Sequence, residues 1–288
     1  MTDDAIEPDL PTDATANEPV GTDGVVDDPQ AEPEQTSPPD ADPPGIDDFL
    51  DNSRRLLRRS DEVLPFVWIA IVMVLMVPSM TKIMQGYDPM QTLQLEIDVW
   101  LLATEMLAHL GAVVLLTLSM PLARAYLLED EGPQTIGGGL EMMARYFPAA
   151  LALSALYYMI VFAGLLMCII PGLLAAALLL PALYMGAVRD ESVLRAFLKA
   201  PGQLGDHSRL FAPVYVGFIA VLFGVSLALG TAIQTAGGVD EILAHGLVAI
   251  LGFSLAFIAV TAVAYLLYIG LLAVFVTIEA YDTGAEIR

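Results

Sequence analysis

Cysteine and basic side chains are scarce in this sequence. Its 288 residues include one cysteine, Cys168, so a disulfide within the chain is excluded. Cys168 lies between Met167 and Ile169 in an apolar run, where we interpret it as a packing residue. Only 12 residues are Lys or Arg against 34 Asp or Glu, which gives a net charge of −22. Nucleic-acid binding needs a basic face, so the charge excludes this class of function.

Recognisable catalytic and cofactor-binding motifs are also missing from the sequence. The three histidines lie on separate segments and do not have the HExxH spacing of zinc proteases. There is no GxSxG elbow, and the glycine run 137–139 is not followed by the Lys and Ser or Thr of a phosphate-binding loop. We therefore expect no enzymatic activity, no metal site and no cofactor. An intramembrane enzyme would still need a nucleophile or metal beside a base.

The acidic residues are concentrated at the N-terminus. Residues 1–51 hold 16 of the 34 Asp and Glu and none of the Lys and Arg, and residues 1–45 hold nine of the 19 prolines. A segment with so few large apolar side chains cannot bury enough surface to offset its ordering entropy. We expect residues 1–45 to form a disordered cytoplasmic tail. It is either a solvated segment whose negative charge only repels other acidic surfaces, or a docking segment for a protein partner.

A basic amphipathic segment follows the tail at residues 46–62. Its apolar residues recur at near-helical spacing, and four arginines lie among them: Arg54, Arg55, Arg58 and Arg59. This pattern predicts a juxtamembrane helix on the membrane surface, whose arginines attract anionic lipid headgroups. The arginines alternatively serve only to keep the N-terminus inside the cell.

The remainder of the chain is strongly apolar. The whole sequence is 56% hydrophobic and 16% charged, with a mean hydropathy of +0.66. Spanning a bilayer takes about 20 mostly apolar residues. Six stretches meet this requirement within residues 63–280: 63–83, 99–120, 147–169, 172–188, 211–231 and 246–278. The sequence thus predicts an all-α integral membrane protein with about six transmembrane helices.

The third and fourth stretches are joined by Ile170-Pro171-Gly172, which predicts a tight helical hairpin. The last stretch is longer than one perpendicular span and contains neither proline nor a polar break. We favour one tilted or protruding helix there over two spans.

The distribution of Lys and Arg predicts the orientation. With the N-terminus inside, 11 of the 12 basic residues are cytoplasmic, and only Lys82 is outside. An even number of spans places residues 281–288 in the cytoplasm as well. A seventh span in the last stretch would move only Arg288 to the outside, so the distribution of Lys and Arg does not exclude it.

Two connections assigned to the cytoplasm are similar. Pro121 and Pro181 begin them 60 residues apart, and Arg145 and Arg209 end them 64 residues apart. This spacing suggests a parallel internal repeat. In the second connection, Arg195 and Lys199 lie on a predicted interfacial helix and would reach phosphate level.

The second half of the membrane segment also carries a resemblance to a known family. The residues concerned are Ile170-Pro171-Gly172, Pro181, Asp190-Glu191-Ser192, Ala196-Phe197 and Gly205. In this order they resemble the membrane domain fused to some bacterial glycerophosphodiester phosphodiesterases, and related stand-alone bacterial membrane proteins of unknown function. This resemblance implies a multi-pass fold in the bacterial plasma (inner) membrane. The chain lacks the phosphodiesterase domain, and residues 202–206 depart from the regular helix expected in that loop.

One polar pair lies inside a predicted span. Glu105 and His109 are four residues apart, on one face of the helix predicted at 99–120. A charge at mid-membrane costs at least about 2.5–3.5 kcal/mol, so the pair is a candidate functional site. It would share or relay a proton or coordinate a cation. A neutral Glu hydrogen-bonded between helices is the structural alternative.

Small residues recur every four positions on the fifth predicted span. Ala220, Gly224 and Ala228 form the row, and Gly217 lies beside it. This spacing allows close helix packing, within the chain or in a homo-oligomer.

Two classes of function remain after these exclusions. The first is a non-catalytic membrane protein that organises, anchors or assists partners. The second is a transporter or lipid-handling protein that uses the Glu105–His109 pair.

Overall fold

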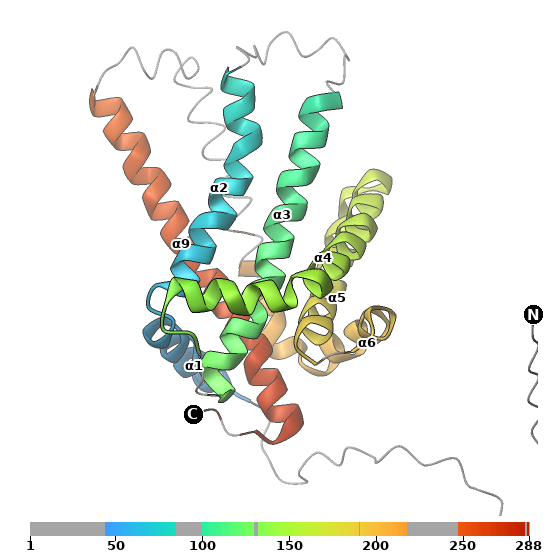
Figure 1. Cartoon of the computed structure of the whole chain (residues 1–288). Helices are drawn as coiled ribbons and strands as arrows, with labels where there is room; N and C mark the ends of the chain where they lie inside the picture. The colour runs from blue at the N-terminus through green and yellow to red at the C-terminus, as the bar shows by residue number, and fades with distance from the viewer. Residues whose placement is uncertain are drawn as a thin grey trace, which may run out of the picture. The chain divides into compact units, whose positions relative to one another are not determined.

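The described part of the chain is helical. The computed structural model describes residues 44–84, 99–129, 132–189, 191–217, 220, 247–285 and 287. These residues contain no strand. The helices are α1 Ile46–Arg59, α2 Val63–Met84, α3 Val99–Arg124, the π-helical turn η2 Ala125–Glu129, α4 Ile136–Met167, α5 Ile169–Val188, α6 Val193–Asp206 and α9 Leu247–Thr283 (Figure 1). Residues 208–217 are also helical.

Several of these helices suit a bilayer. Four are long and apolar enough to cross one: Leu102–Glu129, Ile136–Met167, Ile169–Val188 and Ser254–Thr283. A fifth is added if α1 and residues 63–78, which meet at 92°, are taken as one broken span. The all-helical, membrane-type fold is thus confirmed, with four to five candidate spans among the described residues. Most of the predicted span 211–231 and the acidic tail 1–43 lie outside them.

The bend between α1 and α2 is made by three residues. Ser60, Asp61 and Glu62 separate the helices, and Asp61 has a φ of 27°. Asp is among the few residues that enter the left-handed region with little strain. The chain therefore changes from an amphipathic to an apolar helix within one turn.

Two helices run further than the sequence predicts. α3 continues past Met120 through Pro121 into η2, and α4 begins at Ile136 rather than Phe147. The amphipathic stretch before the third span is therefore continuous with it. Figure 1 shows α4 changing direction along its length, and Pro148, which removes a backbone donor, lies inside it.

The last hydrophobic stretch forms one helix. α9 contains 37 residues without interruption, which corresponds to about 55 Å. This agrees with the expectation of a single tilted or protruding helix. The C-terminal half of α9 is buried from Tyr268 to Ala280, while much of its N-terminal half is exposed.

The α4–α5 hairpin turns earlier than expected. Cys168 alone separates the two helices, in an extended conformation, and Pro171 and Gly172 already belong to α5. The prediction that residues 170–172 form the connection is therefore wrong. Cys168 is exposed, so it does not pack against other side chains of the bundle. The hairpin closes at this point because Gly164 and Gly172 allow the two backbones to touch.

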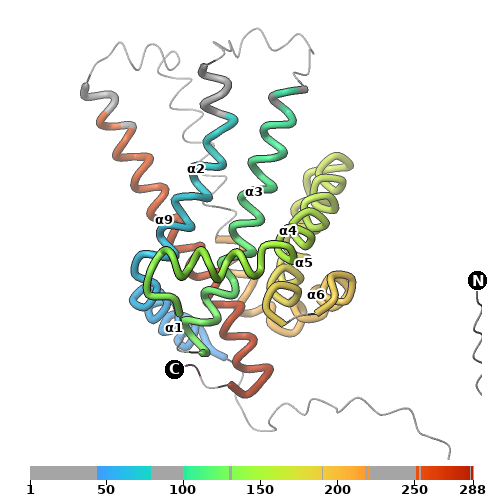
Figure 2. Tube along the Cα trace, in the orientation of Figure 1, coloured from blue at the N-terminus to red at the C-terminus, as the bar shows by residue number. Residues whose placement is uncertain are grey.

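Helix α1 packs against the C-terminal half of α9 (Figure 2). Its Leu56 is fully buried, and the buried Asn52 donates from Nδ2 to Thr277 Oγ1 at 3.0 Å. Asp47 and Asp48 in its first turn and Arg58 and Arg59 in its last complement the helix dipole. One face of the predicted surface helix is thus fixed to the bundle.

Candidate functional site

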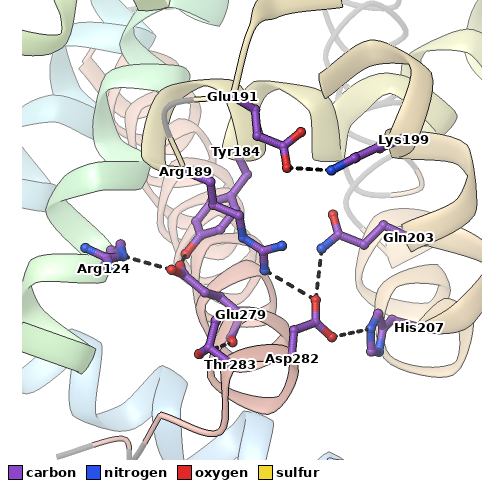
Figure 3. A network of polar contacts seen from close by, with 10 residues as sticks. All are labelled: Arg124, Tyr184, Arg189, Glu191, Lys199, Gln203, His207, Glu279, Asp282 and Thr283. Atoms are coloured by element: carbon purple, nitrogen blue, oxygen red, sulfur yellow. Dashed lines mark hydrogen bonds and ion pairs between the residues drawn. The ribbon is translucent and has the colours of Figure 1, made fainter. Parts of the chain in front are cut away.

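A set of connected charged and polar side chains gathers at the C-terminal end of α9. Glu279 and Asp282 are three residues apart on this helix and reach side chains of α3, of α5 and its C-terminal end, and of α6 and its C-terminal end (Figure 3). A carboxylate in the last turn of a helix is disfavoured by the helix dipole unless a partner compensates it. We refer to these two carboxylates and their partners as the α9 carboxylate network.

Glu279 joins α9 to α3 and α5. It is 4% exposed, and its Oε1 accepts from Arg124 Nε at 3.0 Å. Its other oxygen accepts from the hydroxyl of Tyr184, which is also buried. Arg124 additionally pairs with Glu129 of η2. A buried carboxylate requires compensation of this kind, and here both of its oxygens have a donor.

Asp282 joins α9 to the end of α5 and to α6. Its Oδ2 accepts from Arg189 Nη2 at 3.3 Å and from Gln203 Nε2 at 3.1 Å. Its Oδ1 lies 3.1 Å from His207 Nε2, and since a carboxylate only accepts, the ring donates. Both oxygens of this carboxylate are therefore engaged as well.

The space beside the network is small. A cavity of about 10 Å³ is bounded by side chains that include Tyr184, Gln203, His207 and Phe211. This volume holds about one water molecule. Phe275 stacks on Tyr184 with ring centroids 5.3 Å apart and fills the apolar side. The arrangement fits a lock between helices and not a substrate site.

We also searched the described residues for side chains that could ligate a metal ion. Within the described residues, no group of three or more His, Cys, Asp or Glu side chains is placed to hold a metal ion. Lys199 pairs with Glu191 at 3.1 Å next to the network (Figure 3).

In the Glu105–His109 pair, one ring nitrogen of the histidine contacts the backbone of Glu105. His109 Nδ1 lies 2.7 Å from the backbone oxygen of Glu105, so it is a donor to that carbonyl. A contact between the ring and a carboxylate would therefore use Nε2. His109 is exposed and Glu105 is partly exposed on α3. A function for this pair stays a prediction.

The basic residues predicted to lie at the membrane surface differ in their contacts. Arg55 pairs with Asp51 at 2.8 Å and donates to the Ile287 carbonyl at 3.3 Å. Arg59 donates to the Tyr126 carbonyl at 3.0 Å. The other members of the predicted surface set, Arg54, Arg58, Arg195 and Lys199, are exposed. α6 remains helical through residues 202–206, so the expected irregularity there is absent.

Gly217, which lies beside the predicted row of small residues, faces a neighbouring helix of the same chain. A Cβ at Gly217 would lie 3.9 Å from Leu267 Cδ2 of α9, so this position packs within the chain. Ala220 is helical and exposed, whereas Gly224 and Ala228 lie outside the described residues.

Sequence reasoning does not find Glu279, Asp282, Tyr184, Gln203 and His207. The available signal for the two carboxylates is their position in the last turns of a long apolar helix, where negative charge is unfavourable without a cation. From the sequence alone, Arg124 and Arg189 indicate only which side of the membrane their segments face. Their pairing with α9 depends on how the helices are arranged.

Comparison with known proteins gives no further assignment. No protein-family model, curated protein or solved structure matches this chain.

Proposed function

We propose that the chain is a non-catalytic, multi-pass protein of the bacterial plasma membrane that organises, anchors or assists a protein partner. The observation that carries this proposal is the α9 carboxylate network. All four oxygens of Glu279 and Asp282 accept from donors on other segments, so these ionisable groups are used to hold α3, α5 and α6 to α9. A rigid end of this kind suits a platform for a partner.

The contacts of four arginines also support a cytoplasmic location for both termini. Arg55, Arg59, Arg124 and Arg189 come from segments assigned to the cytoplasm, and each contacts another such segment. These segments therefore lie at one end of the bundle, as the proposed orientation requires.

The acidic tail is the proposed partner-binding segment. Removing residues 1–45 is expected to abolish recovery of a stoichiometric partner from native-lipid nanodiscs, because the deletion removes the segment's charge and reach. Mass spectrometry of the purified nanodiscs provides the measurement. A matched control replaces the tail with a Gly/Ser segment of equal length. The proposal would be contradicted if the full chain, the deletion variant and the Gly/Ser variant all recovered the same partner.

A lipid-handling or transport function is the second candidate. It is favoured by Glu105 and His109, which lie exposed or partly exposed within the apolar candidate span Leu102–Glu129. Polar side chains in such positions are costly and often functional. Glu105→Gln is expected to abolish lipid exchange in proteoliposomes without loss of folded protein, while Glu141→Gln on exposed α4 leaves exchange unchanged. Exchange at the wild-type rate in Glu105→Gln would remove this candidate.

A further inference from the structure

A polar recess lies where α1 meets α2, apart from the α9 carboxylate network. Its volume is about 220 Å³. The residues that line it are Arg58, Arg59, Asp61, Tyr126, Gly132 and Gln134. Three separate segments thus contribute: the α1–α2 junction, η2 and the connection that precedes α4.

Internal hydrogen bonds fix the walls of this recess. Arg59 Nη1 donates to the Tyr126 carbonyl at 3.0 Å, and the Tyr126 hydroxyl donates to the Pro133 carbonyl. Gln134 Nε2 donates to the Gly132 carbonyl at 3.1 Å. A Cβ at Gly132 would overlap the ring of Tyr126, so the ring and the loop fit only with glycine here. The recess is therefore formed before any ligand arrives.

The charges in the recess favour an anion. Among the described residues that line the recess, Arg58 and Arg59 carry guanidinium groups and Asp61 carries a carboxylate. Among the described residues, Arg58 has no hydrogen-bond or ion-pair partner, and its side chain is exposed. The N-termini of α2 and α4 also meet nearby, since a Cβ at Gly139 would lie 2.6 Å from Val63 Cγ1. Their dipoles add positive potential.

We propose that this recess binds the phosphate group of a phosphate ester, with Arg58 as the main ligand and Arg59 as the fixed second cation. Guanidinium groups bind phosphate through charge-assisted and often bidentate hydrogen bonds. The Asp61 carboxylate is an acceptor, so the recess fits an ester that also carries hydroxyl donors. Phosphatidylglycerol and soluble glycerol 3-phosphate both have this chemistry. The position next to the first apolar residues of α2 places the recess at headgroup level in the proposed orientation.

The test compares two arginines on the same helix. Arg54 and Arg58 are both exposed, and both changes to Gln remove one charge, but only Arg58 lines the recess. Native mass spectrometry of the full chain in neutral detergent with added phosphatidylglycerol gives the affinity. We expect Arg58→Gln to weaken lipid binding about tenfold and Arg54→Gln less than about twofold, with Arg58→Lys intermediate. Thermal unfolding confirms that each variant is folded.

Equal losses in Arg54→Gln and Arg58→Gln would overturn the proposal, because they would show that the arginines act only as a diffuse basic surface. Unchanged binding in Arg58→Gln would overturn it as well. Glycerol 3-phosphate added to the wild-type complex distinguishes the source of the phosphate. Displacement of the lipid at millimolar concentration identifies a soluble ester as a ligand of the recess, and retention of the lipid assigns the recess to the headgroup.

Discussion

Glu279→Leu is expected to lower the free energy of unfolding by about 3 kcal/mol. The change leaves the buried hydroxyl of Tyr184 without its acceptor and removes the carboxylate that Arg124 Nε binds at 3.0 Å. Breaking one side of a buried pair costs about 3–5 kcal/mol, and the cost is at the lower end here because Arg124 is one-third exposed and keeps Glu129. Denaturant titration in mixed micelles provides the measurement.

Two further variants separate the network from a general effect of the substitution. Glu141→Leu removes a carboxylate at an exposed position of α4 and is expected to change stability by less than about 0.5 kcal/mol. Arg124→Leu combined with Glu279→Leu should cost less than the sum of the single changes, because neither charge is then left unpaired. Additive costs would mean that Arg124 and Glu279 are not coupled and that the lock between α3 and α9 does not exist.

Gly172→Ala is expected to destabilise the α4–α5 hairpin by about 2–3 kcal/mol, within the range of about 1–3 kcal/mol that overpacking typically costs. A Cβ at Gly172 would overlap the Leu165 side chain and lie 2.6 Å from the Leu165 backbone nitrogen. A side chain could rotate away, but the backbone nitrogen can only move with its helix. The same denaturant titration measures the loss.

The matched control for this change is Gly202→Ala in α6. A Cβ there meets nothing within 4 Å, so only the helix propensity changes. Alanine in a helix is favoured over glycine by about 0.5–1 kcal/mol, and Gly202→Ala should therefore stabilise the chain. Opposite signs for the two substitutions are the expected result. A neutral or stabilising Gly172→Ala would show that the two helices are not in backbone contact.

Much of the helical architecture follows from local sequence. The apolar lengths of α3, α5 and α9 predict helices because a bilayer-length apolar run satisfies its backbone hydrogen bonds only internally. The basic amphipathic pattern predicts α1, and the absence of proline in residues 246–278 predicts that α9 is continuous. Helix ends are less predictable. Proline is tolerated within α3 and α4, and Cys168 rather than Pro171 interrupts the chain.

Pairings between helices were decided only by the tertiary structure. Arg124 and Glu279 are 155 residues apart, and nothing local indicates that they meet at 3.0 Å. The recess at Arg58 likewise forms only because residues 58–61 meet Tyr126, Gly132 and Gln134, which lie far along the chain from them. The sequence by itself determined which segments are apolar, where charge accumulates and that helices form, because these properties depend on neighbouring residues. Which charges are paired and which form a recess depends on helix packing, because burial is a property of the assembled bundle.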